Sequence, residues 1–132
     1  MPQLRTSEAG RLLGVSDDTV RRWVDSGKLA ATRDDVGRVV IAGRDLAAFA
    51  QANAAAPELG SPTVESARNR FTGLVTRVLK DEVMAQVDIQ AGPFRVVSLM
   101  SREAAEEMGL EPGAVVVAST KSTQVVVELV PR

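Results

Sequence analysis

Residues 14–29 read GVSDDTVRRWVDSGKL, and this stretch decides the fold of the first part of the chain. The glycine at its start permits a sharp turn, and the Ser16 side chain that follows is typical of a helix N-cap. Apolar side chains then recur at the i, i+3 and i+4 spacing of one helix face, as Val20, Trp23 and Val24. Gly27 supplies a left-handed stop. The stretch therefore predicts a turn followed by an amphipathic helix over residues 17–26.

The opposite face of this predicted helix carries two adjacent arginines, Arg21 and Arg22. A helix that packs on one side and presents arginines on the other suits insertion into the major groove of DNA, where arginine bonds to guanine or to phosphate. The alternative interpretation is that both arginines are solvated and pair with aspartates at helix spacing. The candidate partners are Asp17, Asp18 and Asp25.

A further predicted helix precedes the turn, over residues 8–13. Thr6 and Ser7 are candidates for its N-cap, because a hydroxyl side chain satisfies a free amide group at the start of a helix. Gly10 lies inside this helix, where glycine costs about 1 kcal/mol relative to alanine. The predicted buried side consists of Ala9, Leu12 and Leu13.

Two predicted strands and a third helix come next. Residues 29–33 and 38–41 read as strands joined by a turn, a hairpin of the kind called a wing. Arg33 and Arg38 lie near its tip. The third helix begins at Gly43. Its predicted buried residues are Leu46, Phe49 and Ala50.

Together these elements resemble the winged helix-turn-helix of the MerR/excisionase type. The resemblance covers nearly all of residues 3–50. Its matching segments are 6–9, 14–16, 19–24, 26–29 and 44–49. In that family the second helix enters the major groove and the wing touches the DNA backbone. By resemblance, the residues expected to contact DNA are Thr19, Arg21, Arg22, Lys28, Arg33 and Arg38.

The chain changes character near residue 51, where the helical pattern gives way to alanine, proline and glycine. We expect a DNA-binding domain over residues 1–54, a linker over 55–63 and a second domain over 64–132. In the second domain, β-branched runs broken by turn residues predict a small OB-like barrel of five strands, with one short helix over 101–108. The predicted strands span residues 71–79, 83–89, 94–100, 114–119 and 124–130. The predicted fold class is therefore α+β with two domains, the first mainly α.

The second predicted strand alternates between apolar and polar residues. Its inward side chains would be Val83, Ala85, Val87 and Ile89, and its outward ones Met84, Gln86 and Asp88.

Hydrogen-bond donors gather before the first of these strands and between the last two. Lys121 stands between two valine-rich strands, where a buried ammonium group is costly unless it pairs with an anion. A set made only of donors suits a fully deprotonated tetrahedral dianion such as molybdate, tungstate or sulfate, whereas hydrogen phosphate carries a proton that needs an acceptor. The alternative is that these side chains are helix caps and solvated surface charges. The donors are Ser66, Arg68, Asn69, Lys121, Ser122 and Thr123.

This second part resembles the Mop/TOBE domain of molbindins, which also forms the sensor half of molybdate-responsive regulators. The segments that carry the resemblance are 66–69, Gly73, 108–113 and 121–125. In that family single domains pair by exchanging strands, and oxyanions lie between subunits. Ala104 stands where relatives carry a second hydroxyl, three residues after Ser101. By resemblance, the anion-binding residues are Ser66, Ala67 through its backbone, Arg68, Asn69, Ser101, Lys121 and Ser122.

The composition excludes several kinds of site. The 132 residues include no cysteine, histidine or tyrosine, which excludes zinc fingers, thiol catalysis and imidazole bases. The net charge of −1 gives no bulk attraction to nucleic acid, so DNA binding must come from a local basic patch or from several copies of one. The chain lacks both an apolar run of the ~18 residues that a membrane helix needs and a signal-peptide pattern. We expect a cytoplasmic protein that is not an enzyme and needs no cofactor or metal, apart from the molybdenum or tungsten of a bound oxyanion.

Three hypotheses of function stay open from the sequence. The first is a DNA-binding transcription regulator that responds to molybdate or tungstate, with the anion held between copies of a homo-oligomer. The oligomer is at least a dimer, and a hexamer formed through the Mop domains is the alternative. The second is a protein that stores or buffers molybdate and uses its helical domain as an adaptor. The third is a DNA-binding protein whose β domain serves only assembly. The operator, the sign of regulation and the preferred anion stay open in all three.

Overall fold

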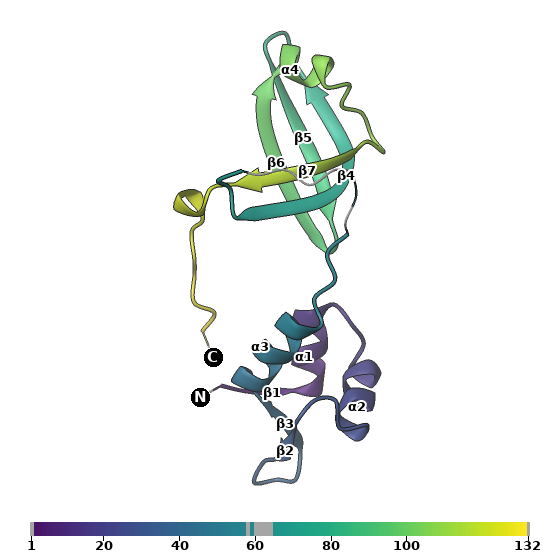
Figure 1. Ribbon diagram of the computed structural model, residues 1–132, viewed down its shortest axis with the longest axis vertical. Coiled ribbons are helices and arrows are strands. Elements are labelled where there is room, and N and C mark those ends of the chain that lie inside the picture. Colours follow the sequence, from purple (N-terminus) through teal and green to yellow (C-terminus); the bar gives the residue numbers. More distant parts are fainter. Residues whose placement is uncertain (1, 58, 60–64, 132) are drawn as a thin grey trace. The chain divides into compact units, whose positions relative to one another are not determined.

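The computed structural model describes residues 2–57, 59 and 65–131. The chain divides into two compact units, Met1–Ala55 and Ala56–Arg132, which are described in turn (Figure 1). The expected linker over residues 55–63 lies largely outside the described residues. Among the described residues, no helix has the length and apolar character required to cross a bilayer.

The first unit packs three helices against a small antiparallel sheet. The helices are α1 (Thr6–Leu13), α2 (Asp17–Asp25) and α3 (Gly43–Ala52). The strands are β1 (Gln3–Arg5), β2 (Thr32–Arg33) and β3 (Val39–Ala42), in the order β1-β3-β2. The hairpin of β2 and β3 is the predicted wing. Strand β1 is not part of the sequence prediction, because three residues are too few to show a period.

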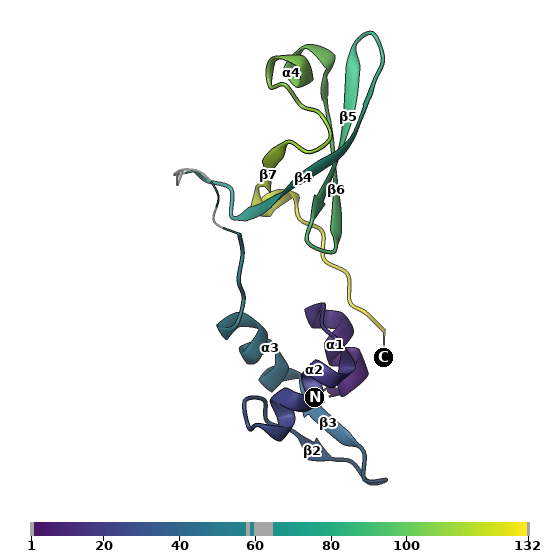
Figure 2. The same cartoon turned by 90° about the vertical axis from the view of Figure 1, so that its right-hand side faces the viewer.

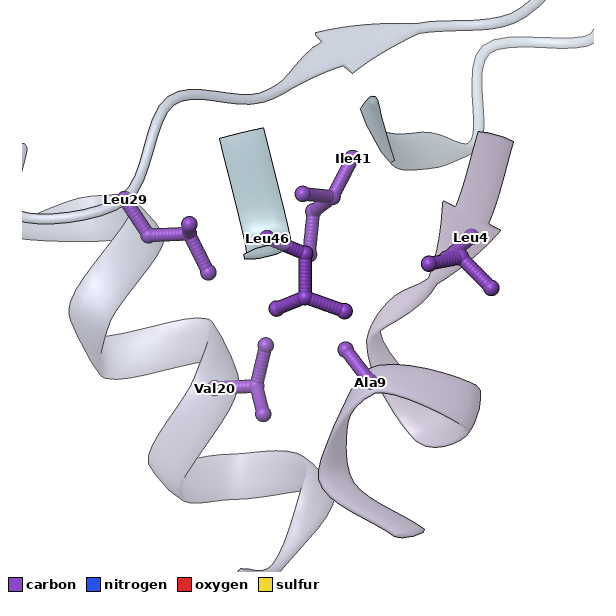
Figure 3. Packing of buried hydrophobic residues seen from close by; sticks show 6 residues of the cluster. All are labelled: Leu4, Ala9, Val20, Leu29, Ile41 and Leu46. Atoms are coloured by element: carbon purple, nitrogen blue, oxygen red, sulfur yellow. The ribbon is translucent and has the colours of Figure 1, made fainter. Parts of the chain in front are cut away.

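The core of this unit takes side chains from every helix and from two strands. Figure 3 shows Ala9 of α1 and Val20 of α2 facing the side chains of Ile41 and Leu46. The buried residues of this core are Leu4, Ala9, Val20, Leu29, Ile41 and Leu46. The predicted apolar face of α2 is confirmed, with Val20 fully buried and Trp23 packed on Phe49 at a centroid separation of 4.8 Å.

The turn between α1 and α2 explains the glycine inside the first helix. A Cβ atom on Gly10 would lie 2.7 Å from the carbonyl oxygen of Val15, a contact that no ordinary side chain makes. Gly14 adopts a φ of 72°, in the left-handed region. The predicted cap of α2 is confirmed, because the Ser16 Oγ accepts a hydrogen bond from the Thr19 backbone amide at 3.1 Å. Gly27 has a φ of 80° and ends α2 as predicted.

Two predictions for the first helix are wrong. Thr6 and Ser7 lie inside its first turn, and Arg5 is the N-cap residue, because β1 leads directly into the helix. Leu12 is 65 % exposed and lies outside the core. The buried stripe of α1 comprises Thr6, Ala9, Gly10 and Leu13, and Leu12 projects roughly 110° away from its centre at the angular step of a helix.

The second unit is a four-stranded antiparallel half-barrel with one short helix. Its strands are β4 (Asn69–Lys80), β5 (Met84–Ala91), β6 (Phe94–Ser101) and β7 (Val115–Thr120), in the order β6-β5-β4-β7. Helix α4 (Arg102–Glu107) follows β6 and lies at the end of the sheet (Figure 2). The core beneath it consists of Val75, Ala85, Val87, Ile89, Ala105 and Leu110.

Strand β4 is long enough to serve two partners. Its first half pairs with β7 and its second half pairs with β5, and the register shifts between Val75 and Arg77. A Cβ atom on Gly73 would lie 2.4 Å from the carbonyl oxygen of Gln90, so only glycine allows this close crossing of β4 and β5. The bulge and the glycine together bend the strand, which curves the sheet into a half-barrel.

The predicted alternation of the second strand holds for Ala85, Val87 and Ile89, which are buried. It is wrong at Val83, which precedes β5 and is 69 % exposed. It is also wrong at Asp88, which points to the opposite face of the sheet but is only 7 % exposed. Burial of this carboxylate is tolerated because Arg95 and Gln86 both donate hydrogen bonds to it. The alternation correctly predicts the side of the sheet to which Asp88 points, but it does not predict that neighbouring side chains cover the carboxylate.

The predicted fifth strand does not form within the single chain. Lys121 caps a 3-10 turn, η1 (Ser122–Gln124), and residues 125–131 continue without strand pairing. In Figures 1 and 2 this segment runs away from the sheet. Val126, Val127 and Leu129 are 86 %, 86 % and 94 % exposed. Four of the five predicted strands therefore form in the described residues.

Candidate DNA-binding surface and anion site

The exposed face of α2 carries an ordered arginine. Thr19 and Ser16 share a hydrogen bond between their hydroxyls at 2.8 Å, and the Arg22 Nη2 donates to the Thr19 Oγ1 at 3.1 Å. Arg22 lies opposite the core face of the helix, where it can reach a ligand without displacing any packed side chain. The N-cap thus orients Arg22 through Thr19.

Arg21 has a different partner. Its Nε and Nη2 lie 3.4 Å and 3.3 Å from the two carboxylate oxygens of Asp17, one turn earlier. The pairing that the solvated interpretation predicts is therefore present at Arg21. A hydrogen bond from the Thr6 side chain, together with the hydrogen bond and charge of Arg21, holds the pKa of Asp17 below its usual value. Asp17 consequently links α2 to the first turn of α1.

The wing is stiffened by side-chain hydrogen bonds across its turn. The Asp34 Oδ1 accepts from the backbone amides of Val36 and Arg38 at 3.1 Å and 2.9 Å, and its Oδ2 accepts from the Arg38 Nε at 3.0 Å. The Arg33 Nη1 donates to the carbonyl of Gly37 at 2.6 Å. Arg33 and Arg38 are therefore exposed and held in fixed positions.

A cavity of about 490 Å³ brings half of the predicted DNA-contact residues together. Arg21, Arg33 and Arg38 line it, while Thr19, Arg22 and the exposed Lys28 lie outside its lining. Arg5 and Ser7, at the start of α1, also line it and were missed by the sequence analysis. Their place in this lining depends on β1, which the sequence did not predict. Strand β1 pairs with β3 and so places Arg5 beside the wing.

In the second unit, the pairing of β4 with β7 places two segments that carry predicted anion-binding residues next to each other in the sheet. Asn69 pairs with Thr120, and its side-chain amide donates to the Thr120 carbonyl at 3.3 Å. Arg68 lies one residue before this pair and Lys121 one residue after it. The predicted anion-binding residues in the two segments that adjoin this pair are Ser66, Ala67, Arg68 and Asn69 on one side and Lys121 and Ser122 on the other.

Ser101 lies elsewhere in the same chain. It pairs with Met84 at the last step of β6, beyond the far end of β4 from Asn69. Its Oγ caps α4 by accepting from the Ala104 amide at 3.1 Å, which leaves its hydroxyl proton available to a ligand. A single chain therefore does not bring Ser101 to the other donors.

A carboxylate also lies close to the anion site. Glu65 forms an ion pair with Arg70, and its backbone carbonyl accepts from the Arg68 Nη1 at 3.5 Å. This carboxylate is absent from the predicted set, which consists only of donors. Arg70 pairs with the charge of Glu65, so the positive charges of Arg68 and Lys121 remain available to a ligand.

The concave face of the sheet is open. A groove of about 470 Å³ runs over it, lined by apolar side chains that include Val87, Ile89 and Val116. Val87 and Ile89 are themselves buried, whereas Val97, Val117 and Met108 in the same lining are 45 %, 42 % and 65 % exposed. The exposed valines of residues 125–130 have a matching apolar character.

Comparison with known proteins assigns both parts of the chain. Residues 4–54 match the helix-turn-helix domain family and residues 65–127 match the TOBE domain family. Molybdenum-pterin-binding protein 2 of Clostridium pasteurianum is 38 % identical over 63 residues, which cover 47 % of this chain and 93 % of that protein. The helix-turn-helix class and the TOBE class of the sequence analysis are confirmed, while the excisionase type of the first domain stays a prediction.

Two solved structures are similar to the second unit. MopII from Clostridium pasteurianum is 36 % identical, covering 50 % of this chain and all of that chain, with a TM-score of 0.47. A molybdate-binding protein from Sporomusa ovata is 25 % identical, covering 51 % of this chain and all of that one, with a TM-score of 0.49. The chain carries a helix-turn-helix domain followed by a TOBE domain, and through the latter it belongs to the family of the molybdenum-pterin-binding proteins.

Proposed function

We propose that this protein is a DNA-binding regulator whose affinity for DNA changes when its TOBE domain binds molybdate or tungstate. The observation that carries the proposal is the pairing of Asn69 with Thr120, which sets Arg68 and Lys121 at one end of the sheet. The same chain also carries a helix-turn-helix domain. No catalytic step is needed for this function.

The ligand follows from the chemistry of the donors. Two cationic side chains and several hydroxyl and amide donors suit an oxyanion that accepts through every oxygen and carries no proton. Molybdate and tungstate have this character at neutral pH. The similarity to a protein named for binding molybdenum-pterin supports a molybdenum species as the ligand. Ala104 removes one hydroxyl that the family resemblance leads us to expect, which favours a weaker or less selective site.

The complete site needs a second copy of the chain. Ser101 lies at the opposite end of β4 from Arg68, so its hydroxyl can join the site only from another protomer. Residues 125–130 carry exposed valines, and the open groove on the sheet offers an apolar surface of the same kind. Exchange of these segments between two copies would form the fifth strand of the predicted barrel. A homo-oligomer, at least a dimer, is the functional unit in this proposal.

The DNA-binding surface is the exposed face of α2 with the wing. In a dimer, two such surfaces would contact two half-sites, so any change in dimer geometry on anion binding would alter DNA affinity. A coupling of this kind is typically worth about 5- to 150-fold in affinity.

The test uses duplexes obtained by selection from a random library with the full-length protein. Binding to the selected duplex is measured by mobility shift while molybdate, tungstate or sulfate is titrated at constant ionic strength. The proposal expects a change in apparent affinity of at least fivefold with molybdate or tungstate. Sequence-selective binding that ignores all three anions would leave a DNA-binding protein with an assembly domain, and anion binding without selected duplexes would leave a storage protein.

A further inference from the structure

The cavity of the first unit is built from three separate elements. It lies between the first turn of α1, the stripe of α2 that carries Asp17 and Arg21, and the wing. Four arginines line it against two aspartates, which gives a formal balance of +2. We call it the wing cavity. Its four arginines are Arg5, Arg21, Arg33 and Arg38.

Both aspartates of the lining, Asp17 and Asp25, are already counted in this balance. Asp17 is already engaged by Thr6 and by Arg21, which occupies its two oxygens. Arg33 and Arg38 each use one N–H group in the wing, and a guanidinium has five. Most of the donors of the wing arginines therefore remain free to bond a ligand.

Such a lining favours a phosphodiester. Each phosphate of DNA carries one negative charge and oxygens that only accept hydrogen bonds, and the planar fork of arginine matches two of those oxygens. The Ser7 hydroxyl is a further donor in the lining. Arg21 and Arg22 are adjacent on α2 and project about 100° apart, so a duplex with bases at Arg22 would bring its backbone towards the cavity side of the helix.

We infer that the wing cavity holds a backbone phosphate of bound DNA, and that Arg5 and Ser7 are therefore DNA-contact residues in addition to those of the wing and α2. Arg21, held by Asp17 in the lining, acts on the phosphate, whereas Arg22 reads base edges. This inference rests on the DNA binding of the proposed function. It assigns different roles to Arg21 and Arg22, which are adjacent in the sequence.

The experiment measures anisotropy of a labelled random-sequence duplex with the full-length protein over a range of salt concentrations. Arg5→Gln is compared with Arg11→Gln, an exposed arginine of α1 that does not line the cavity. Loss of one phosphate contact should weaken binding about three- to tenfold and reduce the slope of log K against log salt by about 0.9. Arg11→Gln should change neither quantity. Equal behaviour of the two variants would overturn the inference.

A second pair of variants separates charge from geometry. Arg5→Lys keeps the charge without the fork, so the salt slope should persist while part of the affinity is lost. Ser7→Ala should weaken binding to random and selected duplexes by the same factor, because a phosphate contact carries no sequence information. Weakening confined to the selected duplex would assign Ser7 to base recognition and contradict the inference.

Inorganic phosphate identifies the source of the ligand. At constant ionic strength, phosphate in the millimolar range should not displace the duplex from the wild type. Displacement from the wild type but not from Arg5→Gln would make the cavity a site for free oxyanions and overturn the assignment to DNA. If the wild type binds no duplex, both the proposed function and this inference are refuted. If DNA binding responds to molybdate but Arg5→Gln binds the duplex as tightly as the wild type, only the assignment of the wing cavity to a DNA phosphate is refuted.

Discussion

Asn69 and Thr120 close the junction of the longest strand with the last one, through their backbone pairing and a 3.3 Å bond from the Asn69 amide to the Thr120 carbonyl. The chain leaves this junction towards Arg68 on one strand and towards Lys121 on the other. Two cations that are 53 positions apart in sequence therefore each lie one residue beyond the same backbone pair. The first prediction follows from this junction.

Lys121→Gln should weaken molybdate binding about 10- to 100-fold, because a hydrogen bond from a charged donor contributes roughly 1.5–3 kcal/mol. Calorimetric titration of the full-length protein measures the change. Lys28→Gln is the matched control, since Lys28 is an exposed lysine of the first unit, outside the TOBE domain. Equal losses in both variants would show that only net charge matters.

Arg70→Gln should also weaken oxyanion binding, although Arg70 is not one of the predicted ligands. Its removal frees the Glu65 carboxylate beside Arg68, where a negative charge repels a dianion and competes for the guanidinium. The double variant Glu65→Gln with Arg70→Gln should recover most of the lost affinity in the same titration. If the double variant stays as weak as the single one, Arg70 itself contacts the anion.

The sequence predicts those parts of the molecule that depend on local periodicity and capping. Nearby residues in the sequence are enough to determine three features: the apolar face of α2, its Ser16 cap and the inward residues of β5. Strand β1 could not be predicted, because it exists only through its pairing with β3. In that pairing Leu4 lies opposite Ile41, which is 37 residues later in the sequence. The role of Arg5 depends on that pairing and was missed for the same reason.

The candidate anion site shows the same division. Its donors were recognisable as residue types, and most of them lie in the two segments that adjoin one strand junction. The separate position of Ser101 and the nearby Glu65 carboxylate could not be read from the chain, because both depend on the register of β4.

Gly10→Ala should destabilise the protein, although alanine is the better helix former by about 1 kcal/mol. The added Cβ would lie 2.7 Å from the Val15 carbonyl oxygen, and the backbone of the turn must move to admit it. We expect a net loss of roughly 1–3 kcal/mol in the free energy of unfolding, measured with urea. Arg11→Ala, at the next and exposed position of α1, should stay within about 0.5 kcal/mol of the wild type. A more stable Gly10→Ala protein would contradict this account of the turn.

Asp88 should make the second unit sensitive to acid. Hydrogen bonds from Gln86 and then Arg95, together with the charge of Arg95, hold its pKa below the ordinary value of 3.8. A carboxyl group whose pKa falls on folding contributes stability above its unfolded pKa and loses it as the pH falls through the lower, folded value. Urea midpoints should therefore drop below about pH 4, and the drop should be shallower in Asp88→Asn. Identical pH profiles for both proteins would exclude this residue as a source of the sensitivity.

Val127→Asp should shift the protein from oligomer to monomer. Val127 is 86 % exposed in the single chain, so the substitution removes no packing from the isolated protomer. In the proposed oligomer the same side chain is buried in a groove like that over Val87 and Ile89, where an unpaired carboxylate costs several kcal/mol. Sedimentation velocity at micromolar concentration reports the mass of both proteins, and Glu128→Gln is the control because it changes the neighbouring residue without adding a charge. A wild type that already sediments as a monomer, or a Val127→Asp protein that remains an oligomer, would contradict segment exchange, and the position of Ser101 would then need another explanation.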